Sequence, residues 1–125
     1  MKFTTAETYG LRAMIYLAQR YGSEQACSLS QIADQENLPL AFLEQIFRDL
    51  KKQGLVTSSR GAQGGYYLAK EPARISMLEI LEAIGGELSL LECNRDFCSQ
   101  NACRISPFIQ DLQSKIRELL AAASL

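Results

Sequence analysis

The chain has 125 residues, of which 47% are hydrophobic, and a formal net charge of −1. That length allows one compact domain with its own core, or a smaller domain with an extension that packs on a partner. The near-neutral charge excludes a globally basic nucleic-acid binder but not a local basic patch. Residues 51–74 contain one acidic residue, Glu71, and five basic residues: Lys51, Lys52, Arg60, Lys70 and Arg74. Such a stretch can bind phosphate groups whatever the total charge is.

The N-terminal residues carry neither a secretory signal nor a membrane span. Glu7, Arg12 and Arg20 interrupt the first apolar residues at helical spacing. No segment reaches the ~18 consecutive apolar residues that a membrane helix needs. We therefore expect a cytoplasmic protein that does not bind membranes and whose thiols are reduced.

Residues 5–21 begin the chain with apolar residues at three- and four-residue intervals, which predicts an amphipathic helix. Ser28 and Gln31 have the spacing of a capping box, so we expect a second, short helix over 28–37. Proline at position 39 ends it and suits the first turn of a third helix over 39–53. The apolar face expected for the third helix consists of Leu40, Leu43, Ile46, Phe47 and Leu50.

After Gly54 the pattern changes to two β-prone stretches around a glycine-rich turn, which predicts a hairpin over 55–69. Two short helices and then a hairpin is the order of a winged helix-turn-helix. The expected fold class is therefore mostly α with a small β-hairpin wing. The alternative is that helix and hairpin merely complete a small α+β core.

Two further helices are expected beyond the hairpin. Ser76 and Glu79 form a capping box for a helix to about residue 84, and Ser106, a candidate N-cap, precedes the last helix. The last helix carries an apolar stripe made of Ile109, Leu112, Ile116, Leu119 and Leu120. We expect two parts: a DNA-binding winged helix-turn-helix domain over 1–75, and the cysteine loop with dimerisation helices over 76–125. Burying the stripe on a second copy gives a homodimer.

The third helix fits the DNA major groove, while the hairpin tip reaches the adjacent minor groove or phosphates. Gln45 can form a bidentate contact with adenine, and Ala41 or Phe42 can touch a thymine methyl group. Arg60 beside flexible glycines suits a narrow minor groove. The DNA-binding candidates are Ala41, Phe42, Gln45, Arg48 and Lys51 on the helix, and Arg60, Gly61, Gln63 and Gly64 on the wing.

Cys93, Cys98 and Cys103 stand four residues apart in one polar stretch. In a reducing compartment such clusters more often bind metal than form disulfides. Three soft thiolates select zinc, copper(I) or an iron–sulfur cluster. Zinc fits less well because the chain has no histidine and no close Cys-x2-Cys pair. The alternative is a solvated loop without a ligand; a catalytic thiol lacks a histidine base, so no enzyme is indicated.

Nearly end to end, the chain resembles the Rrf-type winged helix-turn-helix transcription regulators, the group of IscR, NsrR and CymR. The matching segments are YGLRAM (9–14), FLEQIF (42–47), LKKQGLV (50–56), SRGAQGGY (59–66) and the three-cysteine loop before a final helix. The resemblance implies a homodimer joined through the C-terminal helix, bound to a pseudo-palindromic operator in double-stranded DNA. It also implies DNA contacts at Ala41, Phe42, Glu44, Gln45 and Arg60, and an iron–sulfur cluster, 2Fe-2S or 4Fe-4S, that tunes DNA binding.

The fourth cluster ligand does not follow the relatives. Ser106 stands where some of them have histidine, and Thr8 stands where others have an aspartate from the partner subunit. Glu7 offers a hard oxygen ligand with a longer side chain, and we expect it to act from the partner subunit together with Cys93, Cys98 and Cys103. The other candidates are Asp96, Glu92 and Cys27, although Cys27 is expected to be structural.

Two other functions remain open. One is a cluster-free repressor of the same fold that is controlled by thiols or by a partner protein. The other is a small redox or metal carrier that uses its helices only for packing. A carrier has no need of a basic, glycine-rich hairpin tip, so the wing disfavours it.

Overall fold

The computed structural model describes residues 2–23, 25–61, 64–90 and 105–125. Within these ranges the helices are α1 (Thr5–Gln19), α2 (Leu29–Glu36), α3 (Leu40–Lys52), α4 (Met77–Gly85) and α5 (Ser106–Ala122), with a short 3-10 turn, η1 (Pro72–Arg74). The strands are β1 (Val56–Ser59) and β2 (Gly65–Leu68). The predicted fold class, mostly α with a β-hairpin wing, is confirmed.

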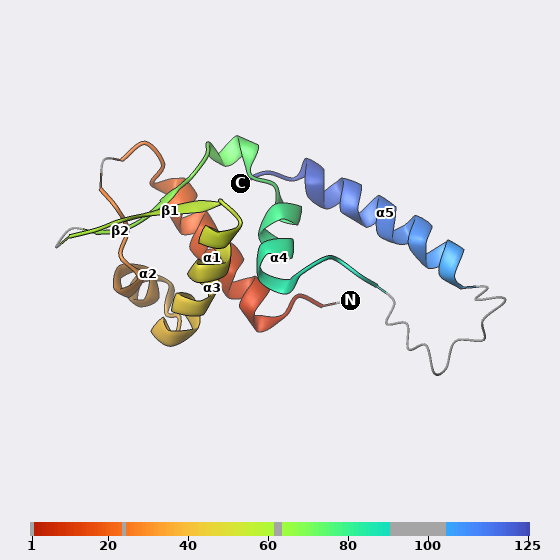
Figure 1. Cartoon of the computed structure of the whole chain (residues 1–125), viewed down its shortest axis with the longest axis horizontal. Helices are drawn as coiled ribbons and strands as arrows, with labels where there is room; N and C mark the ends of the chain where they lie inside the picture. Colours follow the sequence, from red (N-terminus) through yellow and green to blue (C-terminus); the bar gives the residue numbers. More distant parts are fainter. Residues whose placement is uncertain (1, 24, 62–63, 91–104) are drawn as a thin grey trace.

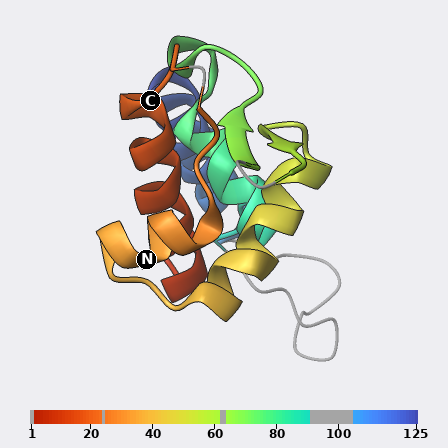
Figure 2. The ribbon, with the colours of Figure 1, turned by 90° about the vertical axis from the view of Figure 1, so that its left-hand side faces the viewer.

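The core lies where α1, α3 and α4 pack together, with α2 closing one side and the hairpin another (Figures 1 and 2). Its fully buried side chains include Met14 of α1, Ile32 of α2, Phe47 of α3 and Ile80 of α4. Burying each such side chain contributes about 1.5–3 kcal/mol to folding. This packing therefore fixes the orientation of α3, with one face in the core and the opposite face exposed to solvent.

The helix starts agree only in part with the predicted caps. The Ser76–Glu79 capping box is present, and the hydrogen bond from the Ser76 backbone N–H, with Lys70 nearby, lowers the pKa of Glu79. The Ser28 hydroxyl accepts from the Gln31 backbone N–H at 3.1 Å, but the Gln31 amide donates to the Tyr16 hydroxyl instead of closing the box. The expected N-cap at Ser106 is wrong: Ser106 is already helical, because the helix starts one residue earlier than that cap requires.

The wing is an antiparallel hairpin in which Val56 faces Leu68 and Ser59 faces Gly65. A short third segment pairs with it, because Cys27 and Tyr66 exchange two backbone hydrogen bonds of 3.1 and 2.8 Å. These two bonds attach the chain that enters α2 to strand β2 of the wing.

Helix α5 begins away from the body of the fold and runs back toward it, so that its C-terminal end lies near the start of α4 (Figure 1). Backbone bonds join Met77 to Ala123 at 2.8 Å and Leu125 to Ile75 at 3.1 Å, and Arg117 pairs with Glu82 of α4. These contacts attach the last helix to the start of α4. The division of the chain into parts 1–75 and 76–125 stays a prediction.

Candidate nucleic-acid interface

The turn between α2 and α3 is short and tightly held. Asn37 adopts a left-handed conformation, with φ 54°, and Leu38 is buried with its N–H donating to the Ala33 carbonyl at 2.9 Å. Arg12 of α1 donates to the Glu36 carbonyl at 2.5 Å, satisfying one of the free carbonyl groups at the end of α2. The geometry is that of a helix-turn-helix.

One face of α3 is buried as predicted, through Leu43, Ile46, Phe47 and Leu50. The prediction for Leu40 is wrong, since 41% of this residue is exposed. Leu40 is one helical turn before the exposed Glu44, so both lie on a flank of the helix that the described residues leave largely open to solvent.

The opposite side of α3 is exposed to solvent. The predicted DNA-binding residues there are all exposed: Ala41, Glu44, Gln45, Arg48 and Lys51. Lys52 is exposed too; it was named as part of the basic stretch 51–74 but not among the DNA-binding candidates of the helix. At about 100° per residue, Lys52 lies on the same side of α3 as Ala41, Gln45 and Arg48. The helical period alone therefore places Lys52 on the candidate DNA-binding surface.

Phe42 differs from its neighbours because it is turned toward α1. Its ring meets Tyr9 edge-on, with centroids 5.4 Å apart and planes at 78°. Phe42 also lines a pocket of about 410 Å³ with Gln45, Ala6 and Ile84. With 40% of the residue exposed, Phe42 packs against α1 and is still accessible from solvent.

Arg60 follows β1 directly and is exposed, as is Gly61, whose φ of 111° few other residues adopt. Gly64 is half-buried, and a Cβ there would lie 2.5 Å from the Ser59 carbonyl oxygen. The wing itself therefore requires these glycines, apart from any approach to DNA. Gln63 lies outside the described residues.

The basic side chains fall into two groups. Arg12, Lys70, Lys115 and Arg117 each pair with a carboxylate. Among the described residues, no carboxylate lies within ion-pair distance of Arg48, Lys51, Lys52 or Arg60, and the same holds for Lys2, Arg20 and Arg74, which lie outside α3 and the wing. Helix α3 and the wing thus carry four exposed cations that form no ion pair with a described carboxylate, although α3 itself also carries Glu44 and Asp49.

The candidate cluster ligands are only partly visible. Cys93, Cys98 and Cys103 lie outside the described residues, as do Glu92 and Asp96. Glu7 closes a capping box at the start of α1, accepting from the Thr4 N–H at 3.0 Å, and it lines a pocket with residues 85–90. Among residues the structure describes, no three metal-binding side chains come together.

Cys27 is buried, with 5% of the residue exposed. Burial raises the pKa of its thiol, and the nearby Arg20 guanidinium offsets only part of that effect. Cys27 is therefore a neutral thiol at neutral pH and a weak metal ligand or nucleophile, in agreement with the structural role expected. No helix in the described ranges has the length and hydropathy to span a bilayer.

A helix-turn-helix followed by a hairpin wing, with cations on both that pair with no described carboxylate, defines the winged-helix class of DNA-binding proteins. Residues 3–125 match the model of the Rrf2 family, described as iron-dependent transcriptional regulators. The chain belongs to the Rrf2 family and is a DNA-binding transcriptional regulator, not an enzyme.

The chain is 43% identical to the regulator CymR of Bacillus subtilis over 96 residues, which cover 77% of this chain and 69% of that protein. It is 31% identical to the regulator IscR of Xenorhabdus nematophila over 127 residues, covering 100% and 77%. Among solved structures, CymR, the global cysteine regulator of B. subtilis, superposes with a TM-score of 0.82 at 35% identity, covering 99% and 92% of the two chains. IscR of T. potens gives 0.76 at 35% identity, covering 99% and 82%.

Proposed function

We propose that this chain is a homodimeric regulator that reads a pseudo-palindromic operator through α3 and the wing, and whose operator affinity is set by an iron–sulfur cluster. The observation that carries the DNA-reading part is the set of exposed cations on α3 and the wing without a carboxylate partner among the described residues. Gln45 and Ala41 contact base edges in the major groove. Arg48, Lys51 and Lys52 contact phosphates, while Arg60, Gly61, Gln63 and Gly64 enter or flank the minor groove.

Selecting the DNA sequences that the protein binds from a pool of random duplexes tests the proposed sequence recognition directly. Recovery of a palindromic motif, with half-sites about one helical turn apart, is the expected outcome. Binding that shows no sequence preference at low and moderate salt contradicts it.

The apolar side of α5 supports the homodimer. Phe108 and Leu119 are each 72% exposed, and Leu112 is 41% exposed. Covering these side chains with a second copy removes the unfavourable apolar surface. Sedimentation at micromolar concentration is expected to give twice the chain mass, and Leu112→Glu with Leu119→Glu to give the monomer mass. A compact wild-type monomer contradicts the homodimer.

Three thiolates from Cys93, Cys98 and Cys103 fit the donor chemistry of an iron–sulfur cluster, with Glu7 of the partner subunit as the fourth ligand. When bound, the cluster supplies a centre whose charge responds to oxidation and ligand loss. Glu7 Oε2 accepts the capping hydrogen bond from the Thr4 N–H, and Oε1 lies close to Gly85 of the same subunit; as a ligand, Glu7 would supply Oε1. The dimer interface would then be linked to the helix that supports α3.

Metal content tests the cluster. Anaerobically purified protein is expected to be brown and to contain iron and acid-labile sulfide, and Cys98→Ala to lose both. Cys27→Ala is the matched control and should retain them, because the buried thiol is not a ligand. Stoichiometric zinc without sulfide contradicts the proposal.

Mixed dimers test Glu7. One subunit lacks its three loop cysteines and the other carries Glu7→Ala, so each dimer has one loop able to bind iron. Ligation across the interface predicts that this loop still forms a cluster with the partner's intact glutamate, whereas ligation within a subunit predicts its loss. Thr4→Ala weakens the same helix cap but keeps the carboxylate, so it controls for lost helix stability. Cluster retention in the Glu7→Ala homodimer eliminates Glu7.

A cluster-free repressor controlled by thiols or by a partner protein is the second candidate. The 43% identity to CymR favours it. Full operator binding by protein without iron or sulfide, unchanged by Cys98→Ala, would support this candidate over the first.

A further inference from the structure

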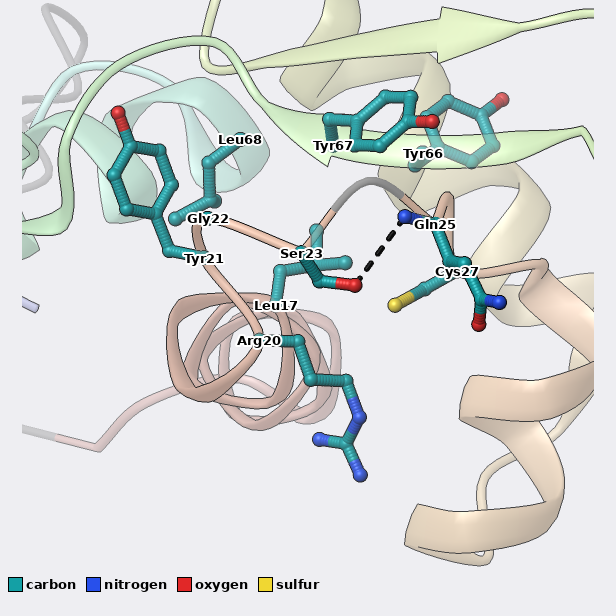
Figure 3. A pocket seen from close by; sticks show the side chains of 10 residues that line it. All are labelled: Leu17, Arg20, Tyr21, Gly22, Ser23, Gln25, Cys27, Tyr66, Tyr67 and Leu68. Atoms are coloured by element: carbon teal, nitrogen blue, oxygen red, sulfur yellow. Dashed lines mark hydrogen bonds between the residues drawn. The ribbon is translucent and has the colours of Figure 1, made fainter.

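A pocket of about 290 Å³ lies between the end of α1, the segment leading to α2 and strand β2. Its walls include Leu17, Tyr21, Tyr67 and Leu68, and Figure 3 shows the Cys27 sulfur turned toward the space beside Leu17 and Ser23. It lies apart from the outer side of α3 and from the described residues near the cysteine loop. None of the proposed DNA or cluster contacts uses it.

The frame of this pocket is fixed by backbone bonds. Cys27 and Tyr66 are joined by two hydrogen bonds, and the Gln25 N–H donates to the Ser23 hydroxyl at 3.2 Å. Gly22, with φ 90°, turns the chain away from α1. Hydrogen bonds therefore hold two walls of the pocket, strand β2 and the segment before α2.

Among the described residues that line the pocket, Arg20 is the only charged one, and in Figure 3 its side chain extends downward from α1 with the guanidinium at the outer rim, away from Tyr67 and Leu68. The guanidinium carbon lies 3.5 Å from the centre of the Tyr16 ring, and Nη1 donates to the Tyr16 carbonyl at 3.2 Å. No described carboxylate lies within ion-pair distance of Arg20, so its remaining N–H groups can bind an anion. Ser23 acts as the acceptor in its bond with Gln25, and its own hydroxyl hydrogen can be donated.

We propose that this pocket binds a small organic carboxylate, with the carboxylate on Arg20 and Ser23 at the edge and an apolar or aromatic body against Leu17, Leu68 and the tyrosines. The volume suits a ligand smaller than a typical drug. Arginine recognises carboxylates through paired N–H donors, and the tyrosine rings supply flat apolar walls.

An occupant would touch both β2 of the wing and the segment that leads into α2. If the position of the wing differs between free and DNA-bound protein, the bound ligand would therefore change the affinity for the operator. This second step rests on the proposed DNA-reading role of the wing, whereas ligand binding does not.

Amide NMR titration of the full-length protein with benzoate, phenylacetate and 3-phenylpropionate tests the site. We expect saturable shifts at residues 20–27 and 66–68 for at least one acid, and at least tenfold weaker binding of the matching uncharged amide. Arg20→Gln should weaken the acid at least tenfold, Arg20→Lys should restore part of the loss, and Arg74→Gln, an exposed arginine elsewhere, should change nothing. Glu24→Gln should not weaken binding, because it removes an acidic side chain from the same segment.

Absence of saturable shifts with all three acids overturns the proposal. So does equal affinity for the acid and its amide, or equal affinity of the wild type and Arg20→Gln for the acid. Operator affinity measured with and without the bound acid tests the second step separately. Unchanged affinity with a saturated pocket overturns the coupling and leaves the site in place. A chain that binds no specific DNA contradicts the proposed function, while the NMR result still decides on the pocket.

Discussion

Lys51 Nζ donates a hydrogen bond to Ser58 Oγ at 2.8 Å, which joins the last turn of α3 to the first strand of the wing. Both residues are exposed, so the bond lies on the surface that we propose for DNA. The ammonium group can still donate two further bonds to a phosphate. One side chain thereby contributes to the angle between the two DNA-contacting elements and to the charge that they present.

Replacing Lys51 with alanine is expected to weaken binding to all sequences about equally. The salt dependence should fall by about one unit per half-site, because one phosphate contact is lost. Ser58→Ala is the matched control, since it removes the hydrogen bond and keeps the charge. If Ser58→Ala reproduces the whole loss in anisotropy titrations at several salt concentrations, Lys51 acts by positioning the wing and not through phosphate.

Gln45 is expected to read a base. Gln45→Ala should cost about 1–3 kcal/mol on the selected operator and relax the preference at one base pair. Gln53→Ala, an exposed glutamine just beyond α3, should leave affinity and preference unchanged. Equal losses on operator and random DNA for Gln45→Ala are the result that contradicts base reading.

Gly65 is expected to be required for folding of the wing. A Cβ at this position would overlap the Cys27 carbonyl and lie 2.7 Å from the Ser28 nitrogen. Gly65→Ala should therefore lower the free energy of unfolding by about 1–3 kcal/mol, as overpacking does, measured by urea denaturation. Thr57→Ala, at an exposed position on β1, should change it by less than about 0.5 kcal/mol. A Gly65→Ala protein as stable as the wild type would show that the hairpin can move away from Cys27 at little cost.

Cys27 gives a pH-dependent prediction. Its thiol has a raised pKa when folded, so the unfolded chain loses its proton first as the pH rises. Stability should fall as the pH rises above the ordinary thiol pKa of about 8.5. In protein whose three loop cysteines are serine, Cys27→Ala should remove that part of the slope, and native Cys27 should react with iodoacetamide far more slowly than the urea-unfolded thiol. Rapid alkylation of the native protein contradicts a neutral, buried thiol.

Much of the fold could be predicted because local and long-range signals agree. The capping box at Ser76, the proline before α3 and the switch to β-prone residues after Gly54 each act within a few residues, and the structure follows them. Leu40 and the Ser28 box were predicted wrongly for a different reason. Their environments depend on what tertiary packing brings near, such as the Tyr16 hydroxyl that takes the Gln31 amide.

The candidate site shows the same division. The exposed side of α3 follows from the helical period, which also places Lys52 on that side. The turn of Phe42 toward Tyr9 could not, because it depends on how α1 crosses α3. The wing glycines were interpreted as serving DNA, whereas Gly64 and Gly65 are also required by backbone contacts that only the folded hairpin creates.

The pairing of residues 75–77 with 123–125 closes a long loop of chain, and that loop contains the three cysteines. Closing a loop costs conformational entropy, by about 0.6 kcal/mol for each doubling of its length if the loop is flexible. A ligand that fixes the cysteine segment shortens the effective loop and lowers this entropic cost. Occupancy of the loop should then strengthen the attachment of α5 to the body even without a new contact, and the attachment can be followed as hydrogen-exchange protection of the Met77 and Leu125 amides.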